Sequence, residues 1–515
     1  MAMTFQEAIK SVINDFGKDI FTNVSVVNIL SDYNGYEECK AFRIILRVII
    51  SEGYLDQIRM TKNWETNCSK LIERFVNNTG FQEEKSAYVI NSIAIGLGLT
   101  NASYSYNQDN STCVTHSNFD YTKTEAENGV KGGIKDEYGV VYSKDGERLI
   151  ACKKKSITSY KVKEGTKIIC DSAFVGCKKL KSIILPHNDI SIGALAFSGC
   201  ESLESFRITK NIKFISYNPF AGCDIISLDG ENDKYVTVDD CLYSKDKKTL
   251  ISYNSYKSND TVINSVQTIG EYAFSENKTL SSLTLTDNVS VIKECAFYNC
   301  KTLKLIKLPK KLKQLEEYVF DGCTNLVSIS IPQGIGSIES YTFANCKNLS
   351  NIDIPTGVNF IDFHAFAYCS GLVNLNLPSS LTTIGNGAFY YCENLNEILF
   401  KEGLEIIEDY AFNSTKNLSK LQLPKSLKSI GKSAFSWNEK IVHLSLPEGL
   451  VSLDEGAFMG LQRLETISLP YSLTNIKKEC FASCYKLQKI TIPYGTKERF
   501  EKLLDKNLHK FLIEK

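Results

Sequence analysis

A phenylalanine returns every 23 residues over most of this chain, and this period constrains the fold more than any other feature. Thirteen phenylalanines follow it, and a single interval of 54 residues, equal to 23 plus an insertion of 31, breaks it. They are Phe174, Phe197, Phe220, Phe274, Phe297, Phe320, Phe343, Phe366, Phe389, Phe412, Phe435, Phe458 and Phe481. Such a period indicates a solenoid, because one coil of 23 residues cannot bury its own apolar face without neighbours.

Further residue columns keep the same period. Isoleucine or leucine lies five positions before every repeat phenylalanine, and a leucine follows most of them six positions later. A short alternating strand comes next, as in Leu326–Pro332, and nine of the ten prolines close such strands. Proline ends a strand because it lacks a backbone donor. With about 4.8 Å between neighbouring strands, thirteen coils predict a rod or arc on the order of 60 Å long.

Cysteine forms a column of its own, three residues after the repeat phenylalanine. Nine of the 17 cysteines lie there: Cys177, Cys200, Cys223, Cys300, Cys323, Cys346, Cys369, Cys392 and Cys484. The odd total argues against a full disulfide framework, and the close C-x-x-C pairs typical of metal sites are missing from the sequence. We therefore expect buried thiols that act as small apolar side chains, which would suit an intracellular compartment.

The pattern I-x-x-x-A-F-x-x-C-x-x-L-x-x-I-x-L-P resembles the BspA-like class of leucine-rich repeats, also called the Treponema pallidum type, over about residues 164–494. Residues 138–152, with V-Y-S-K-D-G, and 235–253, with L-Y-S-K-D-K, resemble hairpin insertions common in that family. Residues 495–515 resemble its closing cap, a charged helix that would shield the last coil. The resemblance implies a ligand-binding or adhesive solenoid without a cofactor, as in many bacterial surface proteins.

The fold class expected is therefore multidomain, an N-terminal all-α bundle followed by a β-rich leucine-rich-repeat solenoid of about 13 coils. Residues 1–98 would form the bundle, with amphipathic stretches such as Phe81–Leu97. Residues 99–134 are rich in Asn, Ser, Thr and Gly, a composition typical of a flexible linker. The solenoid would span residues 135–494 and the cap helix 495–515. The bundle is either an interaction module or a cap on the open edge of the solenoid.

Charge and hydropathy argue against some classes of partner. The 59 Lys and Arg residues balance 59 Asp and Glu, so no long-range field favours nucleic acid. No stretch reaches the roughly 18 apolar residues that a membrane span needs, and Met1–Lys10 lacks the apolar segment of a signal peptide. We expect a cytoplasmic protein with no nucleic-acid partner. A cell-surface location stays open if the start is truncated.

Motifs for catalysis, cofactors and metals are missing from the sequence. The five histidines share no metal-binding spacing, and His364, two residues before Phe366, is interpreted as a variable surface position. The sequence contains no P-loop and no G-x-S-x-G nucleophile motif. We therefore expect a protein that is not an enzyme and has no cofactor.

The outer face of the alternating strands is the candidate binding surface. Side chains alternate along a strand, so the residues flanking its central Ile or Leu point away from the core. In the middle coils these are Ser328, Ser330, Asn351, Asp353, Asn374, Asn376, Glu397, Lys420, Gln422 and His443. Such residues suit hydrogen bonding to a glycan or an extended peptide, although short polar side chains also suit any solvated sheet face. Tyrosines beside the repeat phenylalanines, among them Tyr318 and Tyr391, line a second edge.

These observations favour a non-enzymatic recognition or scaffold protein that binds one partner through the repeat surface and a second through the helical domain. The alternative is a bacterial adhesin or glycan-binding protein whose export signal is missing. A second alternative is an enzyme with an unrecognised site in the helical domain. The ligand and the oligomeric state stay open.

Overall fold

The computed structural model describes residues 133–223, 226–254 and 264–515, helix α6 (Glu83–Gly96) and a few positions near it. The chain separates into two compact units, residues 1–125 and 126–515. In the first unit α6 buries Val89, Ile90 and Ile93, in agreement with the helix expected there. The rest of the predicted bundle and linker lies outside the described residues.

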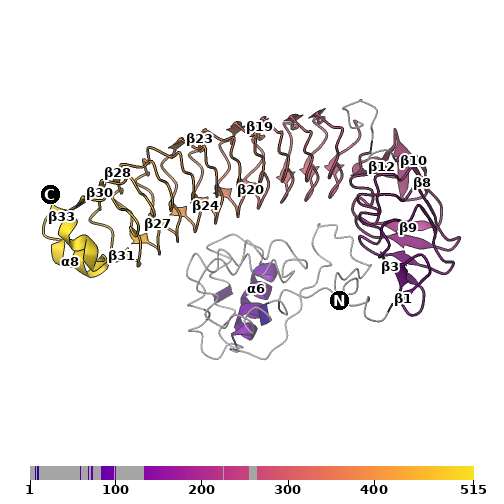
Figure 1. The fold of residues 1–515 in the computed structure, drawn as a ribbon, viewed down its shortest axis with the longest axis horizontal. Coiled ribbons are helices and arrows are strands. Elements are labelled where there is room, and N and C mark those ends of the chain that lie inside the picture. Colours follow the sequence, from indigo (N-terminus) through magenta and orange to yellow (C-terminus); the bar gives the residue numbers. More distant parts are fainter. Residues whose placement is uncertain are drawn as a thin grey trace. The chain divides into compact units, whose positions relative to one another are not determined.

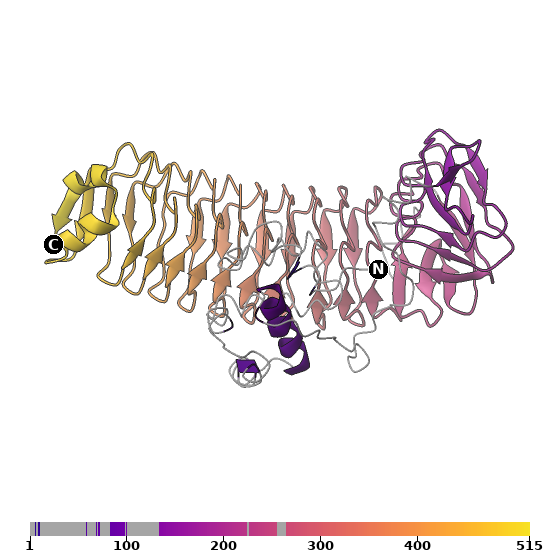
Figure 2. The same cartoon turned by 90° about the horizontal axis from the view of Figure 1, so that it is seen from below.

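Most repeat coils of the second unit contribute one short strand to each of two separate parallel ladders (Figures 1 and 2). In both ladders a residue pairs with the residue 23 positions later, as Ile384 does with Ile407. The first ladder carries the Ile/Leu column and runs through β14 (Thr268–Ile269), β16 (Val291–Ile292), β18 (Gln314–Leu315), β20 (Ser337–Ile338), β22 (Phe360–Ile361), β24 (Thr383–Ile384), β26 (Ile406–Ile407), β27 (Ser429–Ile430), β29 (Ser452–Leu453) and β31 (Asn475–Ile476).

The second ladder carries the alternating strands. Its strands are β15 (Ser282–Thr284), β17 (Leu305–Lys307), β19 (Ser328–Ser330), β21 (Asn351–Asp353), β23 (Asn374–Asn376), β25 (Glu397–Leu399), β28 (His443–Ser445), β30 (Thr466–Ser468) and β32 (Lys489–Ile492). The strand pairing is interrupted between β21 and β23, and isolated bridges of Lys420 and Gln422 link β25 to β28. Before the 54-residue interval, the corresponding ladders are formed by β5 (Ile168–Ile169), β7 (Ile190–Ile192) and β9 (Ile212–Ile215), and by β4 (Ser159–Lys161), β6 (Ser182–Ile184), β8 (Ser205–Ile208) and β10 (Ser227–Gly230). The solenoid has about 15 turns rather than thirteen.

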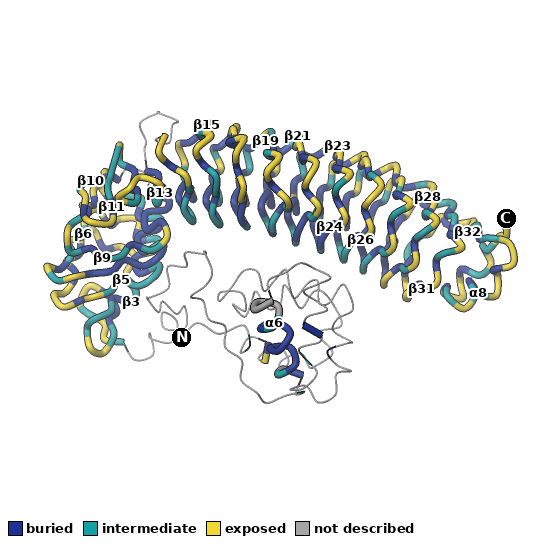
Figure 3. The backbone as a smooth tube through the Cα atoms, turned by 180° about the vertical axis from the view of Figure 1, so that it is seen from behind, coloured by how far each residue is buried: buried dark blue, intermediate teal, exposed yellow. Residues whose placement is uncertain are grey.

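The predicted columns form the core, which lies inside every coil (Figure 3). Every repeat phenylalanine is buried, and neighbouring rings stack nearly parallel, as Phe389 and Phe412 do with centroids 5.1 Å apart. The Ile/Leu column is buried as well. One coil therefore covers the aromatic ring of the next, which explains why the period tolerates so little variation.

The cysteine column is buried too, apart from the half-buried Cys484, and it has a polar role that its burial alone does not suggest. The thiol of Cys346 donates a hydrogen bond to the Phe320 carbonyl one coil earlier, at 3.2 Å. The same contact recurs down the column, for example from Cys369 to Phe343 at 3.0 Å. Where the cysteine is replaced, the Asn438 side-chain amide makes the contact instead, at 3.0 Å from the Phe412 carbonyl. The column thus satisfies buried backbone carbonyls as well as filling space.

Two segments of three antiparallel strands each continue into a parallel ladder within one sheet. The first consists of β1 (Ile134–Lys135), β2 (Val140–Tyr142) and β3 (Arg148–Cys152), and the second of β11 (Tyr235–Val238), β12 (Cys241–Ser244) and β13 (Thr249–Ser252). They coincide with the two segments expected as hairpins.

The C-terminal cap differs from the expected helix over residues 495–515. Helix α8 spans only Lys497–Leu503, and the 3-10 helix η4 (Lys506–Phe511) follows it. The chain then forms strand β33 (Leu512–Glu514), which pairs in parallel with β32. The last ladder strand offers unsatisfied backbone groups, so a strand satisfies them where a continued helix would not.

Candidate functional site

The residues predicted as a binding surface lie on the outer side of the second ladder, which we call the strand face. Nine of the ten are exposed and Ser328 is half-buried. Asn374 pairs with Glu397 in the ladder, and Glu397 forms an isolated bridge with Lys420, so residues of successive coils stand side by side. The central strand residues, such as Leu375, are buried beneath them.

Some strand-face side chains bond to their counterparts one coil away. The Ser330 hydroxyl donates to an Asp353 carboxylate oxygen at 3.3 Å, and His443 Nδ1 lies 2.9 Å from the Thr466 hydroxyl. The face as a whole carries two carboxylates, one ammonium group, one imidazole and a series of amides and hydroxyls. This arrangement can donate and accept hydrogen bonds, but it has no nucleophile held against a base.

A second surface, the aromatic edge, lies where the chain turns around the buried phenylalanines. It consists of Tyr318, Tyr341, Phe363, His364, Tyr368, Tyr390, Tyr391, Tyr410 and Trp437. Tyr318 and Tyr341 stack with centroids 4.7 Å apart, and Tyr341 stacks on His364 at 5.3 Å. Tyr368 and Trp437 are the most exposed, at 42% and 39%. Sequence reasoning singled out some of these tyrosines but missed the histidine and the tryptophan.

His364, interpreted from the sequence as a variable surface position, is half-buried in the aromatic edge. Its ring packs between Tyr341, Phe363 and Tyr390. Burial lowers its pKa to about 4, because the charged imidazolium would lose its hydration there. His364 is therefore a neutral member of the aromatic edge at physiological pH.

The backbone under the aromatic edge is left-handed two residues before and two residues after each repeat phenylalanine, except at Asn218, two residues before Phe220. Tyr341, His364 and Trp437 have φ values of 54°, 50° and 62°. Bulky residues are rare in this conformation, which costs roughly 1–2 kcal/mol for a residue with a Cβ atom. Other coils place glycine there, including Gly387 and Gly460. A comparison of these two columns in the sequence would have found the edge.

Glycine in the neighbouring coil makes room for the large rings. A Cβ atom on Gly387 would lie 2.6 Å from His364 Nε2, and one on Gly460 would lie 2.7 Å from the Trp437 ring. Each ring therefore leans over the glycine of the next coil.

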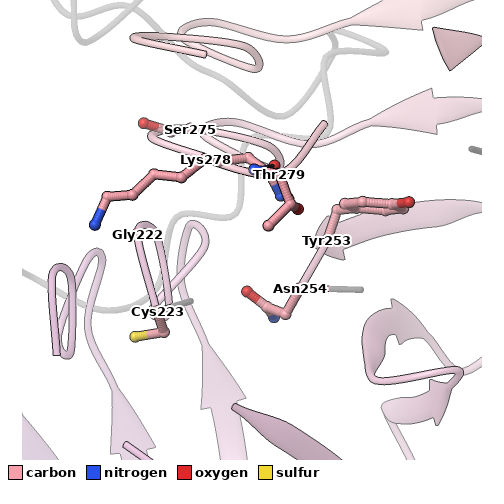
Figure 4. Close-up of a pocket in the computed structure, with 8 residues that line it drawn as sticks. Gly222, Cys223, Tyr253, Asn254, Ser275, Lys278 and Thr279 are labelled. Carbon is pink, nitrogen blue, oxygen red and sulfur yellow. Dashed lines mark hydrogen bonds between the residues drawn. The ribbon is translucent and has the colours of Figure 1, made fainter. Parts of the chain in front are cut away.

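Other features expected of a catalytic or metal site do not converge. A small hollow near the 54-residue interval is lined by Gly222, Cys223, Tyr253, Asn254, Ser275, Asn277, Lys278 and Thr279 (Figure 4). Its polar groups are largely engaged with neighbours, as when the Asn254 amide donates to the Ser252 hydroxyl at 2.6 Å. Among the described residues, no three His, Cys, Asp or Glu side chains are placed to share a metal ion. Nor does any helix in the described part of the chain have the length and apolar character needed to span a membrane.

Comparison with known proteins gives a family and several partly similar solved structures. A model of the BspA type leucine rich repeat region matches in six copies, over residues 150–233, 267–396 and 382–503. A leucine-rich repeat protein from Bacteroides ovatus is 23% identical over 71% of this chain and 93% of its own, with a TM-score of 0.44. A leucine rich cell surface protein from Faecalibacterium prausnitzii is 20% identical over 72% and 95%, with a TM-score of 0.37. The T. pallidum leucine rich repeat protein is 21% identical over 51% and 92%, with a TM-score of 0.29. No curated protein matches the chain.

Proposed function

The chain belongs to the BspA-type leucine-rich repeat family, and we propose that it is a non-enzymatic recognition protein that binds a macromolecular partner through its repeat surface. The family match covers most of the solenoid and confirms the resemblance found in the repeat pattern. Solenoids of this kind present an extended surface on a repetitive core.

One observation supports the strand face as that surface. Coil after coil, the buried columns repeat the same few residue types, whereas the outer positions of the strands change. The first outer position reads Ser328, Asn351, Asn374, Glu397, Lys420 and His443 in successive coils. Packing dictates the inner residues, but nothing in the coil itself requires these outer ones. Residues without a packing role are available for recognition.

The chemistry of the face favours a polar, extended ligand, either a peptide strand or a glycan chain. Amide and carboxylate groups from Asn351, Asp353, Asn374 and Asn376 stand on β21 and β23, the strands of two successive coils. A polymer lying along the ladder would meet a donor or acceptor in every coil.

The test replaces the three asparagines of the face together. The full chain and the Asn351→Ala/Asn374→Ala/Asn376→Ala variant are compared on a glycan array and an extended-peptide array. A control variant, Asn359→Ala/Asn475→Ala, removes two exposed asparagines at the first ladder. We expect signals that the strand-face variant loses at least tenfold and the control keeps. Equal retention by both variants would refute the strand face.

The aromatic edge is a second candidate surface, favoured by the backbone strain that its bulky residues carry. Strained residues persist where another gain offsets their cost, either stacking within the edge or recognition. Tyr and Trp are also the residue types that dominate protein interfaces. Tyr368→Asn and Trp437→Ser restore residue types seen in the same column at Asn345 and Ser414. A partner that binds both variants as well as the parent would assign the edge a purely structural role.

For location, we propose that the protein acts inside the cell, with the helical domain engaging a second partner. The surface-adhesin alternative places the same repeat surface outside the cell. Fractionation of cells that express the native gene product distinguishes the two, because only an exported chain reaches the envelope or the medium. Pull-downs with residues 1–100 and 135–515 used separately test the two-partner scheme.

A further inference from the structure

The solenoid contains two sheets with the same unusual arrangement. The first has the strand order β1-β2-β3-β5-β7-β9, and the second β11-β12-β13-β14-β16-β18. In each, three antiparallel strands are followed by parallel strands of successive coils. The register break also recurs at the same place, between Val141 and Tyr142 in one sheet and between Leu242 and Tyr243 in the other.

The turns of the two antiparallel segments share their hydrogen bonds as well. In the second, the Asp246 carboxylate accepts from the Ser244 hydroxyl at 2.7 Å and from the Lys248 amide at 3.1 Å. Asp145 accepts from the Ser143 hydroxyl and the Glu147 amide in the same way. The second segment thus repeats the start of the solenoid 101 residues further along the sequence.

The core is divided at this second segment. One apolar cluster ends at Leu242, and a second begins at Cys241. Cys241 and Tyr243 join the later cluster, whereas Leu242, between them on β12, joins the earlier one. Because side chains alternate along a strand, β12 is a wall with one core on each side.

At this wall, hydrogen bonds of the Asn218 side chain take the place of a backbone bond that joins ordinary coils. Within a run of coils, the amide of a repeat phenylalanine donates to the next coil, as Phe297 does to the Val319 carbonyl at 2.9 Å. The Phe220 amide instead donates to its own neighbour, the Asn218 side chain, at 2.9 Å. The Asn218 amide group reaches the Tyr272 carbonyl at 2.8 Å, and Lys278 pairs with Glu201 at 3.1 Å. The hollow of Figure 4 lies at this same place.

We infer that the repeat region is two separately capped solenoids in tandem, a first block (residues 133–223 and 226–230) and a second block (235–254 and 264–515), whose cores unfold independently. The antiparallel strands β11–β13 are the N-terminal cap of the second block. The blocks meet at β11–β13, where Tyr235 and Leu242 pack into the core of the first block, and hydrogen bonds such as that from Asn218 to Tyr272 add to this contact. Each block carries its own strand face.

Hydrogen exchange of the full chain, measured by mass spectrometry across a urea series, tests this inference. Phe197→Leu and Phe389→Leu form a matched pair, because both rings are fully buried and each stacks on two neighbours. We expect Phe197→Leu to lower the midpoint of peptides from residues 140–215 by at least ~0.5 M urea and to leave peptides from 266–492 unchanged. Phe389→Leu should do the reverse. A common shift of both sets in either variant would overturn the inference.

The cap assignment has its own test. Asp246→Ala should lower the midpoint of the second-block peptides, and Asp145→Ala should lower only that of the first-block peptides. An unchanged second block in Asp246→Ala would show that β11–β13 do not cap it. If a phenylalanine variant is insoluble, Ile169→Val and Ile384→Val replace the pair, since both isoleucines are fully buried.

Discussion

Removing one ring from the middle of the phenylalanine column gives the most direct measure of what holds the coils together. Phe343 is fully buried, and its ring stacks on Phe320 at 5.5 Å and on Phe366 at 5.2 Å. A Phe→Ala change in a core costs about 3–5 kcal/mol, and each aromatic contact contributes about 0.5–1.5 kcal/mol beyond its burial. Because Phe343 loses two such contacts, we expect Phe343→Ala to cost about 4–5 kcal/mol.

The assay is equilibrium urea unfolding followed by far-ultraviolet circular dichroism. Phe343→Leu keeps most of the buried volume and loses mainly the stacking, so it should cost about 1–2 kcal/mol. Asn374→Ala, on the exposed strand face, should change stability by less than about 0.5 kcal/mol. If Phe343→Ala and Asn374→Ala have the same effect, the assignment of inner and outer columns is wrong.

Three further perturbations address the other columns. His364 has an ordinary pKa of 6.5 when unfolded and about 4 when folded, so the unfolded chain binds more protons between these values. The urea midpoint should therefore fall as the pH drops from 6.5 to 4, and His364→Phe should flatten this dependence; an unchanged slope would contradict the burial of the ring. The Cys392 thiol is buried, and burial raises its pKa to about 12, so it should react with a disulfide reagent only after unfolding; rapid labelling of the native chain would contradict this. Gly460→Ala should destabilise the chain more than Gly165→Ala, because both glycines are left-handed but only the first would place a Cβ against Trp437. When Gly460→Ala is combined with Trp437→Ser, the added loss in urea midpoint relative to Gly165→Ala should disappear. A loss that persists in the double variant would refute the steric explanation.

The sequence predicted the columns well, because burial in a stacked coil fixes both residue type and spacing. Phe343 and Ile361 are buried as expected, and Asn374 is exposed as strand alternation requires. The position of His364 could not be predicted by the same rule. Its left-handed backbone turns the ring onto Tyr341 in the previous coil, and side-chain alternation does not describe residues in a turn.

The two ends of the repeat region were predicted less accurately for a related reason. The terminal segment was expected to be helical throughout, yet Leu512–Glu514 form a strand on the open ladder edge. Residues 235–253 were expected as a hairpin insertion, although strands β11–β13 also close one core and begin another. In both cases the structure of the segment depends on strands outside it, and the segment's own sequence pattern does not predict that pairing.

The wall formed by Cys241–Ser244 also determines how a chain of this kind can change its length. If a 23-residue coil is gained or lost on one side of this wall, the later coils on that side move by one position. The strand pairing on the other side of the wall stays unchanged. Each side can therefore lengthen, shorten or exchange its outer residues without requiring compensation from the other.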